Sequence, residues 1–234
     1  MKINFKSKAL IFAFLLLLLS ANAQDWANLK RYQNENTALT APDNKEDRVV
    51  FMGNSITQGW VEMHPEFFKQ NPYIGRGISG QTTPQMLIRF RQDVIALHPK
   101  VVVILAGTND IAGNTGPSTL EMIIDNLSSM AELANDNGIR VVLCSVLPAY
   151  DYPWKRGMEP NIKIPKLNAL IKAYCEKKGF IYLDYFTPMA DERNGMKAEL
   201  TVDGVHCTLQ GYKVMEQLVQ VAIKQALILS PRKY

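Results

Sequence analysis

Residues 101–110 read VVVILAGTND, an apolar run that ends in glycine, threonine, asparagine and aspartate. A short, β-branched run bounded by glycine predicts a strand that is buried on both faces. Comparable short runs predict strands at residues 48–52, 73–77, 140–146 and 180–183. Between and after these runs, apolar residues recur at three-to-four spacing, which predicts helices at residues 84–98, 118–137, 163–178 and 209–227.

Strands that are apolar on both faces and alternate with helices are typical of a parallel sheet covered by helices on both sides. The fold class is therefore α/β, and a chain of 234 residues has room for one such domain. Ser118 and Glu121 have capping-box spacing, which predicts a helix start at Ser118. Residues 25–39 predict a further helix, packed outside the sheet.

The first 23 residues have the pattern of a secretory signal peptide. Three lysines precede an apolar run over residues 9–19, and small residues at 20–23 end in Ala23. We expect cleavage between Ala23 and Gln24, a single folded domain over residues 24–234, and a secreted or periplasmic protein without stable membrane insertion. The alternative is an uncleaved anchor, but the apolar run is short for roughly 30 Å of hydrocarbon.

Charge and cysteine content exclude several classes of protein. Without residues 1–23 the chain carries 23 basic and 22 acidic side chains, and it lacks the basic run that is typical of a nucleic-acid-binding protein. Cys144, Cys175 and Cys207 lack C-x-x-C spacing, and no His, Asp or Glu cluster has metal-ligand spacing, so neither a metal nor another cofactor is expected. Buried free thiols are the favoured interpretation, with a Cys144–Cys207 disulfide as the alternative.

Polar residues follow each predicted strand, at the edge where open α/β sheets bind ligands. They are Gly53 to Thr57 after the first strand, residues 78–82 after the second, residues 107–110 after the third, an aromatic loop at 148–160 after the fourth, and residues 203–206 after the fifth. Together these segments supply a hydroxyl, an imidazole, a carboxylate and amide donors. Acyl transfer requires such a set: a nucleophile, a base with an orienting acid, and donors for an oxyanion.

The chain has three histidines, and one of them fits the role of base. His98 precedes the third strand, at the opposite edge of the sheet. His64 lies in a loop with no carboxylate placed to hold it, although Glu62 and Glu66 are near in sequence. His206 follows Asp203 by three residues with a glycine between, so one tight turn can point both side chains the same way. We therefore expect His206 to be the base.

Four of these segments resemble conserved blocks of the SGNH (GDSL-like) hydrolases. Gly53-Asn54-Ser55-Ile56 is similar to their first block, residues 78–82 around Gly80 to the second, Gly107-Thr108-Asn109-Asp110 to the third, and Asp203-Gly204-Val205-His206 to the fifth. The four blocks occur in family order over residues 49–212. Any one of them is a weak signal, and four in order are a strong one.

The resemblance implies a three-layer α/β/α sandwich with a five-strand parallel sheet of the flavodoxin-like type. It also implies that Ser55 is the nucleophile, His206 the base and Asp203 its orienting acid. The oxyanion donors would be the backbone N–H groups of Ser55 and Gly80 and the side-chain amide of Asn109. Asn54 stands where the family usually has aspartate, and we expect it still to hydrogen-bond the turn.

Within the superfamily, the first two blocks look most like the acetylhydrolase branch, which includes carbohydrate acetyl esterases. We therefore expect a secreted esterase for short acyl groups, acetyl above all, on a small-molecule or glycan ester. Trp60, Tyr152 and Trp154, with Tyr150, are candidates for stacking on sugar rings.

Two alternatives remain. A lysophospholipase or thioesterase of the same fold would need an apolar groove, lined by Met63, Phe67, Phe68 or Met158. The other alternative is a non-catalytic glycan-binding protein on a hydrolase scaffold. No feature of the sequence indicates an oligomeric state.

Overall fold

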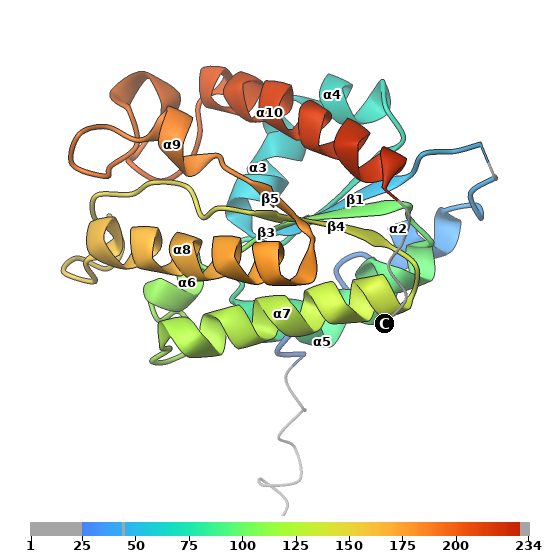
Figure 1. Cartoon of the computed structure of the whole chain (residues 1–234), viewed down its shortest axis with the longest axis horizontal. Coiled ribbons are helices and arrows are strands. Elements are labelled where there is room, and N and C mark those ends of the chain that lie inside the picture. The colour runs from blue at the N-terminus through green and yellow to red at the C-terminus, as the bar shows by residue number, and fades with distance from the viewer. Residues whose placement is uncertain (1–24, 44, 230–234) are drawn as a thin grey trace, which may run out of the picture.

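The computed structural model describes residues 25–43 and 45–229, and the predicted signal peptide lies outside these residues. A five-stranded parallel sheet forms the centre, in the order β2-β1-β3-β4-β5 (Figure 1). The strands are β1 (Val49–Gly53), β2 (Tyr73–Gly77), β3 (Val101–Leu105), β4 (Arg140–Cys144) and β5 (Ile181–Leu183). This confirms the predicted α/β fold and strand count, and the order is that of flavodoxin-like sheets.

Helices cover both faces of the sheet and make three layers (Figure 1). One layer contains α3 (Ser55–Met63), α4 (Pro65–Lys69) and α10 (Leu209–Ile228). The other contains α5 (Thr83–Asp93), α7 (Leu120–Asp136) and α8 (Pro160–Lys178). The shorter elements are α2 (Gln33–Ala38), α6 (Thr108–Ile111), α9 (Phe186–Met189) and two 3-10 turns, Ile95–Leu97 and Ala198–Leu200.

Alternation along the strands divides the apolar residues between two cores. In β1, Val50 and Met52 pack with α5 and α7, whereas Val49 and Phe51 pack with the aromatic residues of α3 and α4. Successive side chains of a strand point to opposite faces, so a strand with cover on both sides is apolar throughout. Because the sheet is fixed from both sides, the loops at its carboxyl edge start from rigid positions.

Several predicted elements differ from those observed. The helix predicted at residues 84–98 ends at Asp93 and is followed by the 3-10 turn Ile95–Leu97, and the helix predicted at residues 163–178 begins earlier, at Pro160. Residues 25–32 form turns instead of helix, because the Asp25 carboxylate accepts hydrogen bonds from the N–H groups of Leu29 and Lys30, and only α2 is helical. Helix α7 begins at Leu120, capped by the Thr119 hydroxyl and not by Ser118. The fourth strand ends at Cys144, two residues earlier than predicted.

All three cysteines are buried and free, so the alternative of a Cys144–Cys207 disulfide is not observed. Burial raises the pKa of the Cys207 thiol to about 12. Within residues 25–43 and 45–229, no helix is both long and apolar enough to span a bilayer. The same residues contain no group of three His, Cys, Asp or Glu side chains placed to hold a metal ion.

Candidate active site

Ser55 is the first residue of α3, directly after the turn that leaves β1. The Asn54 side chain caps this helix by accepting a hydrogen bond from the N–H of Ile56 at 3.2 Å, the turn contact expected of it. β2 approaches the turn closely, since a Cβ on Gly77 would lie 2.6 Å from the carbonyl oxygen of Asn54. The serine therefore sits at a helix N-terminus, where unpaired N–H groups favour negative charge.

His206 and Asp203 come from the loop before α10 and reach Ser55 as a chain of contacts. The Ser55 hydroxyl oxygen lies 2.9 Å from Nε2 of His206, and Nδ1 of His206 lies 2.7 Å from a carboxylate oxygen of Asp203. The other oxygen of Asp203 accepts from the N–H groups of Val205 and His206. The tight turn expected from the sequence thus points both side chains toward the serine.

Hydrogen bonding decides the charge of Asp203. Partial burial opposes ionisation, but the hydrogen bonds from the backbone and ring of His206 outweigh it and hold the pKa of Asp203 below its ordinary value. An ionised carboxylate beside Nδ1 favours a proton on that nitrogen. Nε2 then offers its lone pair to the Ser55 hydroxyl, the arrangement that general-base activation of a serine needs.

The two further predicted oxyanion donors lie on either side of Ser55, because β1 has β2 and β3 as its neighbours. Gly80 follows β2, is exposed, and has a φ of +78°, which favours glycine. Asn109 lies on α6 after β3, is 3% exposed, and donates one amide N–H to the carbonyl of Gln81 at 2.9 Å. An asparagine amide has a second N–H, so Asn109 keeps a donor for a ligand.

Asp110 has a structural contact that the sequence did not reveal. Its buried carboxylate accepts hydrogen bonds from both the N–H and the hydroxyl of Thr83, at the start of α5. Burial raises its pKa to about 6, although the bonds from Thr83 oppose the shift. Asp110 therefore ties the loop after β3 to α5.

Of the aromatic residues predicted to stack on sugar rings, Tyr150 and Trp154 are exposed, and of these two Trp154 lies near the candidate base. Its side chain is 44% exposed, its ring centroid lies 6.1 Å from that of His206, and its indole N–H points to the amide oxygen of Asn114 at 3.4 Å. Tyr152 is fully buried beneath it, with stacked rings 5.0 Å apart. The predicted substrate contact of Tyr152 is therefore wrong, because the ring supports Trp154 from below.

The prediction for Trp60 is also wrong. Its side chain is 1% exposed and stacks between Phe67 and Tyr212 in the core beside α10. Its indole N–H donates to Glu216. Trp60, Phe67, Phe68 and Tyr73 form one aromatic cluster that serves packing, with members from α3, α4 and β2.

The two other histidines lie outside the site. His64 contacts Glu216 of α10 at 2.6 Å, so the expectation that no carboxylate holds it is wrong. The partner is 152 residues away in sequence, which is why local sequence could not reveal it. His98 ends the 3-10 turn before β3 in a left-handed conformation, at the opposite edge of the sheet as expected.

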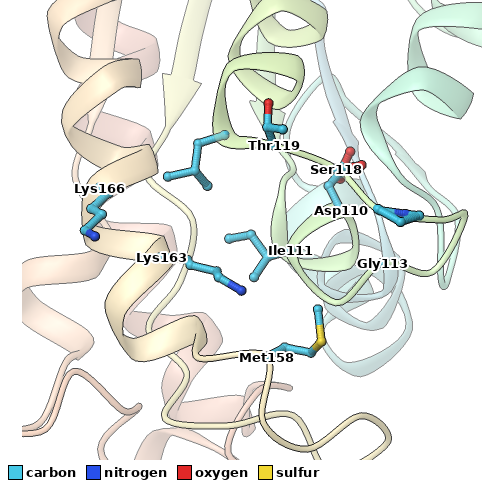
Figure 2. A pocket seen from close by; sticks show the side chains of 10 residues that line it. Asp110, Ile111, Gly113, Ser118, Thr119, Met158, Lys163 and Lys166 are labelled. Carbon is cyan, nitrogen blue, oxygen red and sulfur yellow. The ribbon is translucent and has the colours of Figure 1, made fainter.

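The apolar groove of the lipase-like alternative is not formed by its candidate residues. Phe67 and Phe68 are buried, whereas Met63 is exposed on the surface of α3. Met158 lines a separate cavity of about 360 Å³ between α8 and the loop after α6 (Figure 2). Lys163 and Lys166 also line this cavity, so its wall is not purely apolar.

Comparison with known proteins identifies a family and several relatives. The model of the GDSL-like Lipase/Acylhydrolase family matches residues 51–214. A crystal structure of a GDSL-like lipase from Bacteroides thetaiotaomicron is 53% identical, covers 86% of this chain and 99% of its own, and has a TM-score of 0.84.

Two curated relatives are more distant. An acetylxylan esterase of Xylanibacter ruminicola is 24% identical over 80% of this chain, and the uncharacterized lipoprotein YqeF of Bacillus subtilis is 27% identical over 60%. The chain spans 45% and 58% of the lengths of these two relatives.

Proposed function

Since the chain belongs to the GDSL-like lipase/acylhydrolase family, we propose that it is an exported serine esterase that removes acetyl groups from carbohydrate. Ser55 is the nucleophile, His206 the base and Asp203 the orienting acid. The observation that carries the proposal is the contact chain from the Ser55 hydroxyl through both ring nitrogens of His206 to Asp203. No metal or other cofactor takes part in the proposed reaction.

The proposed reaction has two halves. Nε2 of His206 accepts the serine proton while Oγ of Ser55 attacks the acetyl carbonyl carbon, and the carbonyl oxygen becomes an oxyanion. The N–H groups of Ser55 and Gly80 and the free amide N–H of Asn109 stabilise that charge. The bond between the acetyl carbon and the sugar oxygen then breaks, and that oxygen takes the proton from His206 and leaves as a hydroxyl. Water repeats the sequence on the acetyl-enzyme, and acetate leaves.

Two observations support carbohydrate as the acetyl-bearing partner. The relative from Xylanibacter ruminicola is named an acetylxylan esterase. The exposed Trp154 ring lies beside His206, where a sugar that carries the reacting acetyl group has to sit. Aromatic faces bind sugar rings by burying apolar surface over a rigid plane. The substrate class is thus a glycan ester or a small acetyl ester.

Export is the remaining part of the proposal. The basic start, apolar run and small residues before Gln24 have the pattern of a signal peptide. The name of the Bacillus subtilis relative, a lipoprotein, also favours a location outside the cytoplasm. Acetylated polysaccharides are met there, so location and substrate agree.

The experiment that tests the function compares wild type, Ser55→Ala and Ser129→Ala on 4-nitrophenyl acetate, 4-nitrophenyl octanoate and acetylated xylo-oligosaccharides. Ser129 lies on α7 with its hydroxyl bonded to its own helix, so it is the matched control. We expect Ser55→Ala to lose all turnover and Ser129→Ala to retain it.

Acetyl esters should be hydrolysed at least tenfold faster than octanoyl esters. A preference for octanoyl esters would indicate the lipase-like or thioesterase alternative. Glycan binding without any turnover by the wild type would indicate a non-catalytic protein.

A further inference from the structure

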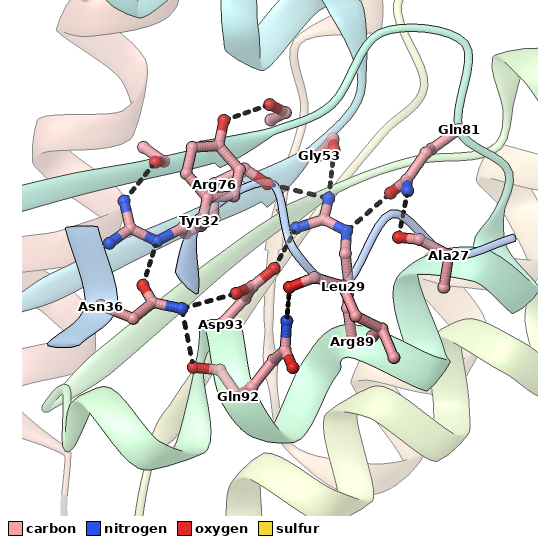
Figure 3. Close-up of polar contacts among 12 residues, drawn as sticks. Ala27, Leu29, Tyr32, Asn36, Gly53, Arg76, Gln81, Arg89, Gln92 and Asp93 are labelled. Atoms are coloured by element: carbon pink, nitrogen blue, oxygen red, sulfur yellow. Dashed lines mark hydrogen bonds and ion pairs between the residues drawn. The ribbon is translucent and has the colours of Figure 1, made fainter. Parts of the chain in front are cut away.

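Arg89 of α5 is fully buried, and its guanidinium joins three segments of the carboxyl edge (Figure 3). Its Nη2 donates to the carbonyls of Gly53 at 3.0 Å and Arg76 at 2.9 Å, which lie at the ends of β1 and β2. Its Nε donates to the side-chain oxygen of Gln81 at 2.6 Å. Asp93, one turn along the helix, neutralises the charge through a contact of 3.0 Å.

Gln81 carries this contact toward the site. Its side chain is held at both ends, because the amide oxygen accepts from Arg89 and the amide nitrogen donates to the carbonyl of Ala27 at 2.7 Å. Its main-chain carbonyl accepts the N–H of Asn109 at 2.9 Å. Since that bond sets the direction of the Asn109 amide, the position of Gln81 determines where the second amide N–H points.

The segment of residues 25–39 is hydrogen-bonded to the same group of residues, although it precedes the part of the chain that the family model matches. Three glutamines at or near α5 donate to its main-chain carbonyls: Gln81 to Ala27, Gln85 to Trp26 and Gln92 to Leu29. The Tyr32 hydroxyl donates to the carbonyl of Gly77, at the end of β2. The segment therefore binds along the same edge of the sheet as the loop of residues 78–82, which contains Gly80.

We propose that Arg89 and Gln81 are positioning residues for the esterase reaction, and that the carbonyl of Ala27 fixes Gln81 in place. Neither residue touches substrate. Together they hold the end of β1 before Ser55 and the carbonyl that orients Asn109. This inference rests on the proposed function, because it concerns the oxyanion donors of that reaction.

The physical reason lies in the distance dependence of oxyanion stabilisation. A donor acts fully only when it is preorganised at hydrogen-bond distance from the oxygen of the tetrahedral intermediate. A buried guanidinium in a fixed fork geometry holds several carbonyls at set distances from one another. Loss of the Gln81 side chain frees the loop of residues 78–82 to shift, and the Asn109 amide shifts with it.

The test compares Gln81→Met with Gln92→Met, both as the full chain. The Gln92 side chain donates to the same N-terminal segment at 2.6 Å but forms no hydrogen bond with Arg89 or Gln81, so it is the matched control. For Gln81→Met we expect kcat on 4-nitrophenyl acetate to fall about tenfold with KM within about twofold, since a misplaced donor costs less than a deleted one. For Gln92→Met we expect kcat within about twofold of wild type. Equal losses of kcat in both variants, or none in Gln81→Met, overturn the proposal.

A second measurement does not depend on hydrolysis. The side-chain amide signals of Asn109 in a ¹H–¹⁵N NMR spectrum, assigned by their loss in Asn109→Ser, should move in Gln81→Met and stay in place in Gln92→Met. Unmoved signals in Gln81→Met overturn the positioning role even if the protein proves inactive as an esterase. Moved signals in a protein without turnover keep the positioning role and refute the proposed function instead.

Discussion

At the scale of single residues, Asp203 determines which nitrogen of His206 faces the serine. Its lowered pKa keeps the carboxylate ionised at neutral pH, so it can accept a hydrogen bond from Nδ1 of His206. Asp203→Asn presents an amide N–H to Nδ1 and favours the wrong tautomer. We expect kcat to fall by about 10³ without unfolding. Steady-state kinetics with a circular dichroism spectrum checks this, and a loss under tenfold would contradict the assigned role.

We propose that Asn109 acts on the oxyanion and not on the ground-state ester. Because its amide has one N–H committed to Gln81, the other supplies the proposed contact. Asn109→Ala should lower kcat by about 10²–10³ with a smaller change in KM. Measurement of both constants on 4-nitrophenyl acetate separates the outcomes. A raised KM with unchanged kcat would make Asn109 an ordinary binding residue.

At the scale of elements, the irregular loop of residues 145–159 is the candidate specificity element. Trp154 rests on Tyr152, whose hydroxyl accepts a hydrogen bond from Thr108 beside the site. Trp154→Ala should reduce kcat/KM about tenfold on an acetylated xylo-oligosaccharide and change it little on 4-nitrophenyl acetate, because only the larger substrate reaches the ring. Matched kinetics on both substrates tests this. Equal losses on both would mean that Trp154 supports the fold of the site and not the sugar.

Elements with a strong local pattern of apolar residues could be predicted from the sequence. Elements whose conformation depends on residues far along the chain could not. The buried strands have apolar runs that admit one interpretation, and β2 and the start of β3 fall where the pattern put them. The turns at residues 25–32 are closed locally by Asp25, but their carbonyls also bind glutamines more than fifty residues away. The residues of the candidate site also fall into a group that could be predicted and a group that could not. Ser55, Asp203 and His206 come together as expected, whereas Trp60 and Tyr152 are buried by contacts that no local pattern encodes.

At the scale of the whole molecule, the ionisation of Asp110, beside the candidate site, makes the free energy of unfolding depend on pH. Its pKa is about 6 in the folded protein and near 3.9 in an unfolded chain, so between these values the folded state holds a proton that the unfolded state has lost. The contribution of this group to the free energy of unfolding therefore falls as pH rises from about 4 to 6, and it stays constant above.

Asp110→Asn removes that dependence, because the amide does not titrate. The free energy of unfolding of the variant minus that of wild type should rise by about 2 kcal/mol between pH 4 and pH 6 and then level off. Urea unfolding of both proteins at several pH values measures this difference. A difference that is independent of pH would show that Asp110 does not titrate in this range.

In the proposed mechanism His206 activates Ser55 as the nucleophile, at the edge of the sheet where α3 begins and the loop before α10 ends. The most direct measurement is covalent labelling with a fluorophosphonate, followed by mass spectrometry of the digested protein. We predict a single adduct on the peptide that contains Ser55, strongly slowed in His206→Gln and absent in Ser55→Ala. An adduct that persists in Ser55→Ala, or that maps to another residue in the wild type, would show that Ser55 is not the nucleophile.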